Sequence, residues 1–88
     1  MYFVYILKSL RDDRTYVGYT NNLDERLKRH NAGLVFATKH RSPLKLIYSE
    51  QFDTIKEAMN REKYFKSGGG RRKMKQMFLN DLQFAKSE

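Results

Sequence analysis

The chain contains no cysteine and only two histidines among its 88 residues. The absence of cysteine excludes disulfide bonds, thiolate catalysis and the cysteine-based zinc sites of zinc fingers. The two histidines, His30 and His40, are not paired at the spacing of metal ligands. Any bound metal ion must therefore be held mainly by oxygen atoms, which favours Mg²⁺ or Mn²⁺ over Zn²⁺.

Long apolar runs are also absent. No stretch approaches the ~18 consecutive apolar residues of a membrane span, and the N-terminus has no signal-peptide pattern. We therefore expect a soluble, cytoplasmic protein without a membrane anchor. The length is that of one domain, so we expect residues 1–88 to form a single domain.

Acidic residues are few beside basic ones. The chain has 10 Asp and Glu against 18 Lys and Arg, which gives a formal net charge of +8. This excess attracts polyanions, of which nucleic acid is the leading candidate and an anionic membrane surface the second. Many small proteins are basic without a polyanionic partner, so charge alone does not decide between these alternatives.

The sequence does contain a regular succession of strand and helix patterns. The apolar run 2–8 indicates a strand buried on both faces. The β-branched and aromatic run 15–20 follows after a short polar turn, as in an antiparallel hairpin. The remaining predicted elements are a strand at 44–52 and helices at 22–33, 54–67 and 71–84. The order β-β-α-β-α-α predicts an α+β fold.

Capping residues mark the predicted helix ends. Asn22 and Glu25 predict the start of the first helix, and Thr54 and Glu57 have the spacing of a capping box. The glycines at 68–70 predict a break between the second and third helices.

Glu62 is unusual for its place on the second helix. The apolar stripe of this helix consists of Ile55, Ala58, Met59 and Phe65. Glu62 is predicted to lie in the middle of the stripe, where a carboxylate is costly unless it is paired or binds a cation. An ion pair with Lys66, four residues later, is one explanation. We favour the other explanation, a functional carboxylate.

Arg26 and His30 share an arc of the first helix with its two leucines, so they face the sheet. Arg26 either lays its stem along the core edge and reaches water, or holds its guanidinium at the rim of a cleft. The strands add Tyr5 and Tyr16, with Gly18 beside them as a bulge or a point of close approach. Tyrosines in strands are usually packing residues. Convergence of these groups with Glu62 would make a site for a phosphate and a metal ion.

A set of basic residues forms a candidate phosphate-contacting surface. Its members are Lys39, His40, Arg41, Lys66, Arg71, Arg72, Lys73 and Lys75. A solvated basic face with no partner is the alternative, because charge runs of this kind are common.

Together these residues resemble the GIY-YIG nuclease superfamily. The resemblance lies in "VYI" at 4–6, "YVG" at 16–18, Arg26, His30 and Glu62. The segments "HNAG", "TKHRSPLKLIYSE" and "NREKYFKSG" are similar to those of the small stand-alone bacterial members. The resemblance extends from Tyr2 to about Lys75.

The resemblance implies a three-stranded antiparallel sheet with the first strand central, flanked by helices. It also implies metal-dependent hydrolysis of a nucleic-acid phosphodiester, with Glu62 holding Mg²⁺ or Mn²⁺. Tyr5 and Tyr16 would position the attacking water, and Arg26 would offset charge on the phosphoryl oxygens. His30 would supply proton transfer or only a hydrogen bond.

The chain departs from its relatives at two positions. Tyr19 stands where several catalytic relatives carry a lysine, and Asn80 is at a doubtful spacing for the asparagine that follows their glutamate. We expect a monomeric, Mg²⁺-dependent DNA endonuclease acting in repair or recombination. The alternative is a noncatalytic nucleic-acid-binding module that keeps the nuclease scaffold.

Overall fold

The structure, a computed structural model, describes residues 1–87, with side chains described through residue 78. Its centre is a three-stranded antiparallel sheet in the order β2-β1-β3. The strands are β1 (Tyr2–Ser9), β2 (Thr15–Thr20) and β3 (Leu44–Phe52), and the helices are α1 (Leu23–Asn31), α2 (Ile55–Lys66) and α3 (Gly68–Ser87), with a 3₁₀ helix η1 at Phe36–Thr38. This order and the central position of β1 confirm the predicted α+β fold.

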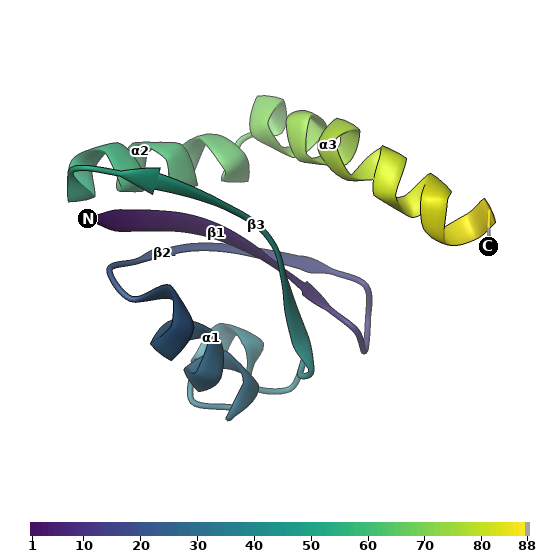
Figure 1. Cartoon of the computed structure of the whole chain (residues 1–88), viewed down its shortest axis with the longest axis horizontal. Helices are drawn as coiled ribbons and strands as arrows, with labels where there is room; N and C mark the ends of the chain where they lie inside the picture. Colours follow the sequence, from purple (N-terminus) through teal and green to yellow (C-terminus); the bar gives the residue numbers. More distant parts are fainter. Residues whose placement is uncertain (88) are drawn as a thin grey trace.

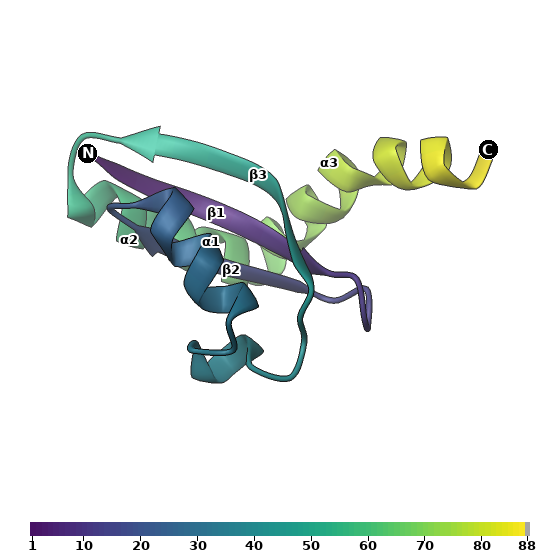
Figure 2. The same cartoon turned by 60° about the horizontal axis from the view of Figure 1, so that its bottom comes forward.

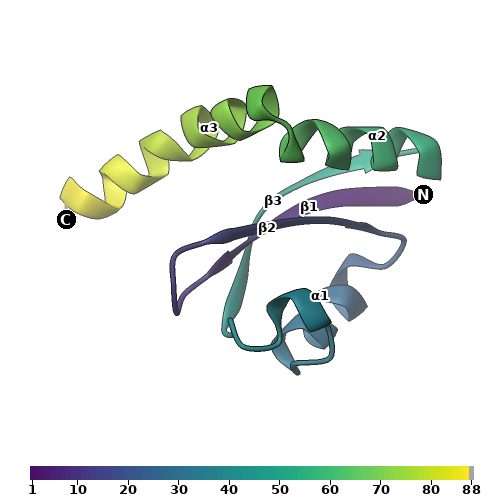
Figure 3. The same cartoon turned by 180° about the vertical axis from the view of Figure 1, so that it is seen from behind.

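Helices cover the two faces of the sheet (Figure 1). Helix α2 lies over one face, and α3 continues from its end and projects beyond the sheet. Helix α1 and η1 lie against the opposite face, as the turned and rear views also show (Figures 2 and 3). The edge strand β2 therefore has α1 on one side and α2 on the other.

Strand β1 is buried on both faces, as its continuous apolar sequence predicts. Val4 and Ile6 are fully buried and belong to a cluster with Phe65 of α2. Tyr5 and Leu7 are 1% exposed and belong to a second cluster, which includes leucines of α1. Each such side chain contributes roughly 1.5–3 kcal/mol when fully buried. The alternation of these residues also fixes the strand register, because a slip by one residue would exchange the two faces.

The predicted caps at the starts of α1 and α2 are confirmed. The Asn22 side chain accepts a hydrogen bond from the backbone N–H of Glu25. Thr54 and Glu57 form the complete capping box, with the two reciprocal hydrogen bonds. These bonds satisfy backbone donors that have no partner inside the helix.

The prediction that glycines 68–70 interrupt the helix is wrong. The break is at Ser67, whose backbone is extended (φ −80°, ψ 168°), and the glycines form the first turn of α3. The Ser67 hydroxyl accepts from the N–H of Gly70 and so caps the new helix. No helix within the described residues, α3 included, combines the length and apolarity needed to cross a membrane.

Candidate active site

A cleft of about 490 Å³ opens beside the edge strand β2, between α1 and α2. Tyr5 of β1, Tyr16 of β2, Arg26 of α1 and Glu62 of α2 all line this cleft. The four residues come from four different elements and are brought together by the antiparallel hairpin and by the helices on its two faces. The structure therefore assembles four of the five residues predicted for the catalytic and metal sites around one space.

Gly18 opens the path by which Tyr5 reaches this cleft. It pairs with Tyr5 across the β1–β2 ladder. A Cβ atom at this position would lie 2.5 Å from the Tyr5 hydroxyl oxygen and 3.1 Å from Cε1 of Tyr16. Only glycine leaves room for the two rings, so the sequence signal at Gly18 is one of close approach.

The Tyr5 hydroxyl is held from two sides. It lies 2.8 Å from Nε2 of His30, and Nε of Arg26 donates to it at 3.3 Å. Burial raises the pKa of Tyr5, against the hydrogen bond from Arg26, which lowers it. The same hydrogen bond is the main cause of a raised pKa of Arg26. At neutral pH, Tyr5 is therefore a protonated phenol and Arg26 a cation.

His30 lies behind Tyr5 and does not line the cleft. Its side chain is fully buried, and Nδ1 lies 2.7 Å from the hydroxyl oxygen of Thr38 in η1. Burial, followed by repulsion from the Arg26 cation, lowers the pKa of His30 to about 4. The ring is therefore neutral near pH 7, and it contacts the cleft only through Tyr5.

Thr38 is the residue of this cluster that sequence reasoning missed. It lies in the segment read as a basic loop, and a threonine there carries no periodic signal. Its role depends on a chain reversal: the loop after α1 returns so that Thr38 is buried against His30, eight residues earlier. Such a contact is set by the path of the loop and has no local sequence signature.

Tyr16 packs against the buried pair. Its ring centroid lies 6.3 Å from that of Tyr5 and 5.1 Å from that of His30, with the His30 ring edge-on. Tyr16 is half-buried, so one edge of the ring reaches the cleft. Packing against two buried rings restricts where its hydroxyl can point.

Glu62 lies at the edge of the buried face of α2, displaced from the predicted centre. Ala58 and Phe65 are fully buried, whereas Ile55 and Met59, predicted for the same stripe, are 45% and 40% exposed. On an ideal helix, Glu62 is turned about 50° from the direction midway between the two buried residues. Its side chain is 20% exposed, so its carboxylate can reach both the core edge and the cleft.

The carboxylate of Glu62 has a basic partner on its own helix. Nζ of Lys66 lies 3.5 Å from Oε2, which is the ion pair considered from the sequence. Within the described residues there is no group of three or more His, Cys, Asp or Glu that would enclose a metal ion. A single carboxylate fits Mg²⁺, which keeps several waters and takes substrate phosphates as ligands, better than a metal that needs a full protein cage.

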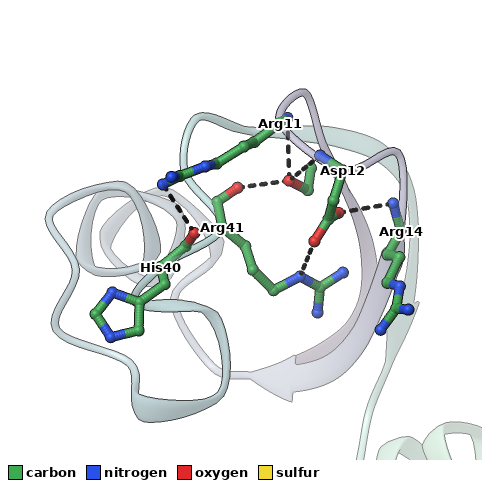
Figure 4. Close-up of polar contacts among 6 residues, drawn as sticks. Arg11, Asp12, Arg14, His40 and Arg41 are labelled. Atoms are coloured by element: carbon green, nitrogen blue, oxygen red, sulfur yellow. Dashed lines mark hydrogen bonds and ion pairs between the residues drawn. The ribbon is translucent and has the colours of Figure 1, made fainter.

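The predicted basic surface is divided between the two faces of the sheet. Lys39, His40 and Arg41 lie on the side of α1, in the loop that packs against the β1–β2 turn (Figure 4). There Nε of Arg41 pairs with Asp12 at 3.2 Å, and Arg11 donates to the His40 carbonyl. The remaining basic residues, Lys66 and those of α3, belong to the other layer.

Tyr19 and Asn80, the two departures from the relatives, have different outcomes. Tyr19 lines the cleft, close to where a lysine would add a charge. The side chain of Asn80 lies outside the described residues.

Comparisons with known proteins agree with this architecture. A family model described as the GIY-YIG catalytic domain matches residues 1–75. The chain is 44% identical over 81 residues to a UPF0213 protein of Bacillus licheniformis, covering 91% of this chain and 80% of the relative. It is 41% identical over 86 residues to the UPF0213 protein YazA of Bacillus subtilis, covering 97% and 84%.

A solved structure is similar as well. The solution NMR structure of a UPF0213 protein from Bacillus halodurans has a TM-score of 0.54 and 34% sequence identity. It covers 90% of this chain and 85% of that one. From the family model, the identity to these relatives and the cleft residues, we conclude that the chain belongs to the GIY-YIG family.

Proposed function

We propose that the chain is a metal-dependent endonuclease that hydrolyses DNA phosphodiester bonds, in repair or recombination. The observation that carries this proposal is the convergence of Tyr5, Tyr16, Arg26 and Glu62 on one cleft. A cation, two phenols and a carboxylate are the groups needed to bind a phosphate, orient water and hold a metal ion.

Arg26 is suited to binding the scissile phosphate. Its Nε donates to Tyr5, which fixes the guanidinium at the cleft. The planar group carries five N–H donors, so donors on the Nη atoms remain for phosphoryl oxygens. Since the pKa of Arg26 is raised, the charge that would offset the developing negative charge is permanent.

The tyrosines are suited to positioning the attacking water. A phenol whose pKa is raised by burial is a poor base at neutral pH, so Tyr5 acts as a hydrogen-bonding group. Tyr16, packed against Tyr5 and His30, presents the second hydroxyl. Two fixed hydroxyls restrict the orientation of a water molecule, and orientation alone can lower a barrier substantially.

Glu62 would hold the metal ion, for which Mg²⁺ and Mn²⁺ have the preferred oxygen chemistry. A bound ion would supply Lewis-acid stabilisation of the phosphate and of the leaving oxygen. Lys66 must then move from Oε2, and its exposed side chain (52%) has the freedom to do so.

The test is cleavage of single-stranded, duplex and branched DNA by the purified protein with Mg²⁺, with Mn²⁺ and with a chelator. We expect metal-dependent cutting that Glu62→Gln abolishes. Glutamine keeps the shape of glutamate, and unchanged circular dichroism of the variant would show that its fold is intact. Absence of cutting on all three substrates, or wild-type rates in Glu62→Gln, would refute the proposal.

A noncatalytic nucleic-acid-binding module is the second candidate. The ion pair between Lys66 and Glu62 favours it, because the pair occupies the only carboxylate found in the described cleft lining. Tyr19, in place of a lysine, leaves the cleft with less positive charge. This candidate predicts salt-sensitive binding without turnover. Metal-requiring cleavage that is lost in Tyr16→Phe would exclude it.

A further inference from the structure

A second, larger cavity adjoins the cleft. This groove of about 740 Å³, here called the α3 groove, lies between the β1–β2 turn and the junction of α2 with α3. Its basic lining residues are Arg14, Lys66, Arg71 and Lys75, and its α3 floor consists of Met74 and Phe78. The volume lies in the range of pockets that take small ligands or parts of larger ones.

One face of α3 builds most of this groove. Arg71, Met74, Lys75 and Phe78 follow the spacing i, i+3, i+4 and i+7, so they lie on the same side of the helix. Arg71 and Lys75 are exposed, whereas Met74 and Phe78 are half-buried against the core. The helix therefore presents cations at the rim and apolar surface at the floor.

The charge of the groove calls for an anionic occupant. Four cations line it, and the only acidic residue in its described lining is Asp13. The Asp13 carboxylate lies 3.7 Å from Nζ of Lys8, so its charge is partly balanced outside the groove. An occupant that combines negative charge with an apolar face matches both the rim and the floor, and a nucleotide has this combination.

The α3 groove is continuous with the cleft. Tyr16 lines both cavities. Nζ of Lys66, a lining residue of the groove, lies 6.0 Å from the Tyr16 ring centroid and 3.5 Å from the Glu62 carboxylate. A strand with a phosphate bound in the cleft therefore needs to pass only one ring to enter the groove.

We propose that the α3 groove binds the nucleotide next to the scissile phosphate. Arg14, Arg71 and Lys75 contact its phosphates, and its unstacked base lies on Met74 and Phe78. Arg14 was not among the residues predicted from sequence; it joins the site because the β1–β2 turn faces α3 across the groove. The assignment of the cleft phosphate as the scissile one rests on the proposed function, but nucleotide binding in the groove does not.

The chain offers a matched control for the phosphate contacts. Arg71→Gln/Lys75→Gln removes two charges from the groove, and Arg72→Gln/Lys73→Gln removes two charges from neighbouring positions that do not line it. Binding of a fluorescent single-stranded oligonucleotide is measured by anisotropy in chelator over a range of salt concentrations. We expect the first variant to lower the salt slope by about 1.4 and the affinity by roughly tenfold, and the control to have a clearly smaller effect.

The base contact is tested without changing the protein. Oligonucleotides with a single abasic site at successive positions are compared, and we expect one position to weaken binding by about tenfold. Equal effects of the two double variants, or no position sensitive to base removal, would overturn the proposal. So would loss of binding to anionic vesicles in Arg71→Gln/Lys75→Gln with unchanged oligonucleotide binding, because the groove would then serve a membrane surface.

These measurements separate the two proposals. Since they are made without metal, a protein that binds in the groove but never cuts would refute the nuclease activity and leave the groove assigned. A protein that cuts DNA equally well with either double variant, and binds it equally, would keep the activity and lose the groove.

Discussion

The hydroxyl oxygen of Tyr5 lies 2.8 Å from Nε2 of His30, and both side chains are buried. On the other side of the ring, Nδ1 lies 2.7 Å from the Thr38 hydroxyl, which has no other hydrogen-bond partner among the described residues. A buried hydroxyl proton without an acceptor costs about 1–3 kcal/mol. Thr38 must therefore donate to Nδ1, which places the single proton of the neutral ring on Nε2.

This arrangement predicts the protonation state of each atom in the cluster. His30 donates to Tyr5 from Nε2, and the Tyr5 oxygen accepts from His30 and from Arg26, so its own proton points toward the cleft. Nitrogen-15 NMR of the histidine ring measures this directly, and we expect Nε2 to be protonated and Nδ1 to be bare. Thr38→Ser should keep this tautomer, whereas Thr38→Val should lose the preference. A wild-type ring protonated on Nδ1 would contradict the prediction.

Gly18→Ala should weaken both the fold and the site. The new Cβ would lie 2.5 Å from the Tyr5 hydroxyl oxygen, and that ring cannot retreat because His30 and Tyr16 pack against it. Overpacking of this kind costs about 1–3 kcal/mol. In a domain of this length, each kcal/mol lowers the melting temperature by roughly 4–8 °C. Calorimetry measures the loss, and any DNA-cleaving activity should fall with it.

Gly69→Ala is the control for Gly18→Ala. No atom lies within 4 Å of a Cβ at Gly69, and the residue is helical. We expect unchanged stability or a gain of up to about 1 kcal/mol, since alanine is favoured over glycine in a helix. Equal stability of the two variants would show that the space around Tyr5 is larger than the structure indicates.

Much of the fold follows from local patterns. The apolar run of β1 predicts its central place, and the caps at Asn22 and Thr54 predict two helix starts. These signals are short-range, so they can be read from one sequence. Tyr5, Arg26 and Glu62 were recognised as candidates because polar groups stood at positions that face apolar neighbours.

The parts that could not be predicted depend on long-range packing. The apolar pattern of α2 does not show that the helix buries Ala58 and Phe65 and leaves Ile55 exposed, because the burial depends on where the sheet ends. The place of His30 behind Tyr5 depends on the loop that returns Thr38 to it. The α3 groove likewise needs Arg14 and α3 to meet across the molecule.

His30 should make the stability depend on pH in the mildly acidic range. Its pKa is about 4 in the folded protein, against 6.5 in the unfolded chain. Between these values the unfolded state binds more protons, so the free energy of unfolding rises with pH from 4 to 6.5 and is lost as pH falls. The full effect is at most about 3 kcal/mol. Urea denaturation at intervals between pH 4.5 and 7, values chosen within about this window, measures it.

The control for this pH dependence is the second histidine. His30→Gln should flatten the slope, whereas His40→Gln, at an exposed position, should keep it. The lowered pKa of Asp12, caused mainly by a backbone hydrogen bond from Arg14, acts below its ordinary value of 3.8 and so outside this window. An unchanged slope in His30→Gln would show that another group carries the effect.

Gly70→Ala should disrupt the junction of α2 with α3. A Cβ at Gly70 would overlap the carbonyl oxygen of Tyr64 and lie 2.5 Å from Cα of Phe65, and backbone atoms cannot move aside as a flexible side chain can. The first turn of α3 would have to shift, and the contacts of Met74 and Phe78 with the core would loosen. We expect a loss of stability larger than that of Gly18→Ala.

Gly68→Ala is the matched control for this junction, because no atom lies within 4 Å of a Cβ there. Denaturant unfolding of both variants measures the difference in stability, and amide hydrogen exchange shows where it arises. For Gly70→Ala, we expect faster exchange in the first turn of α3 and unchanged exchange in β1 under native conditions. Equal exchange in the first turn of α3 for the two variants would contradict the close packing of this turn against the end of α2.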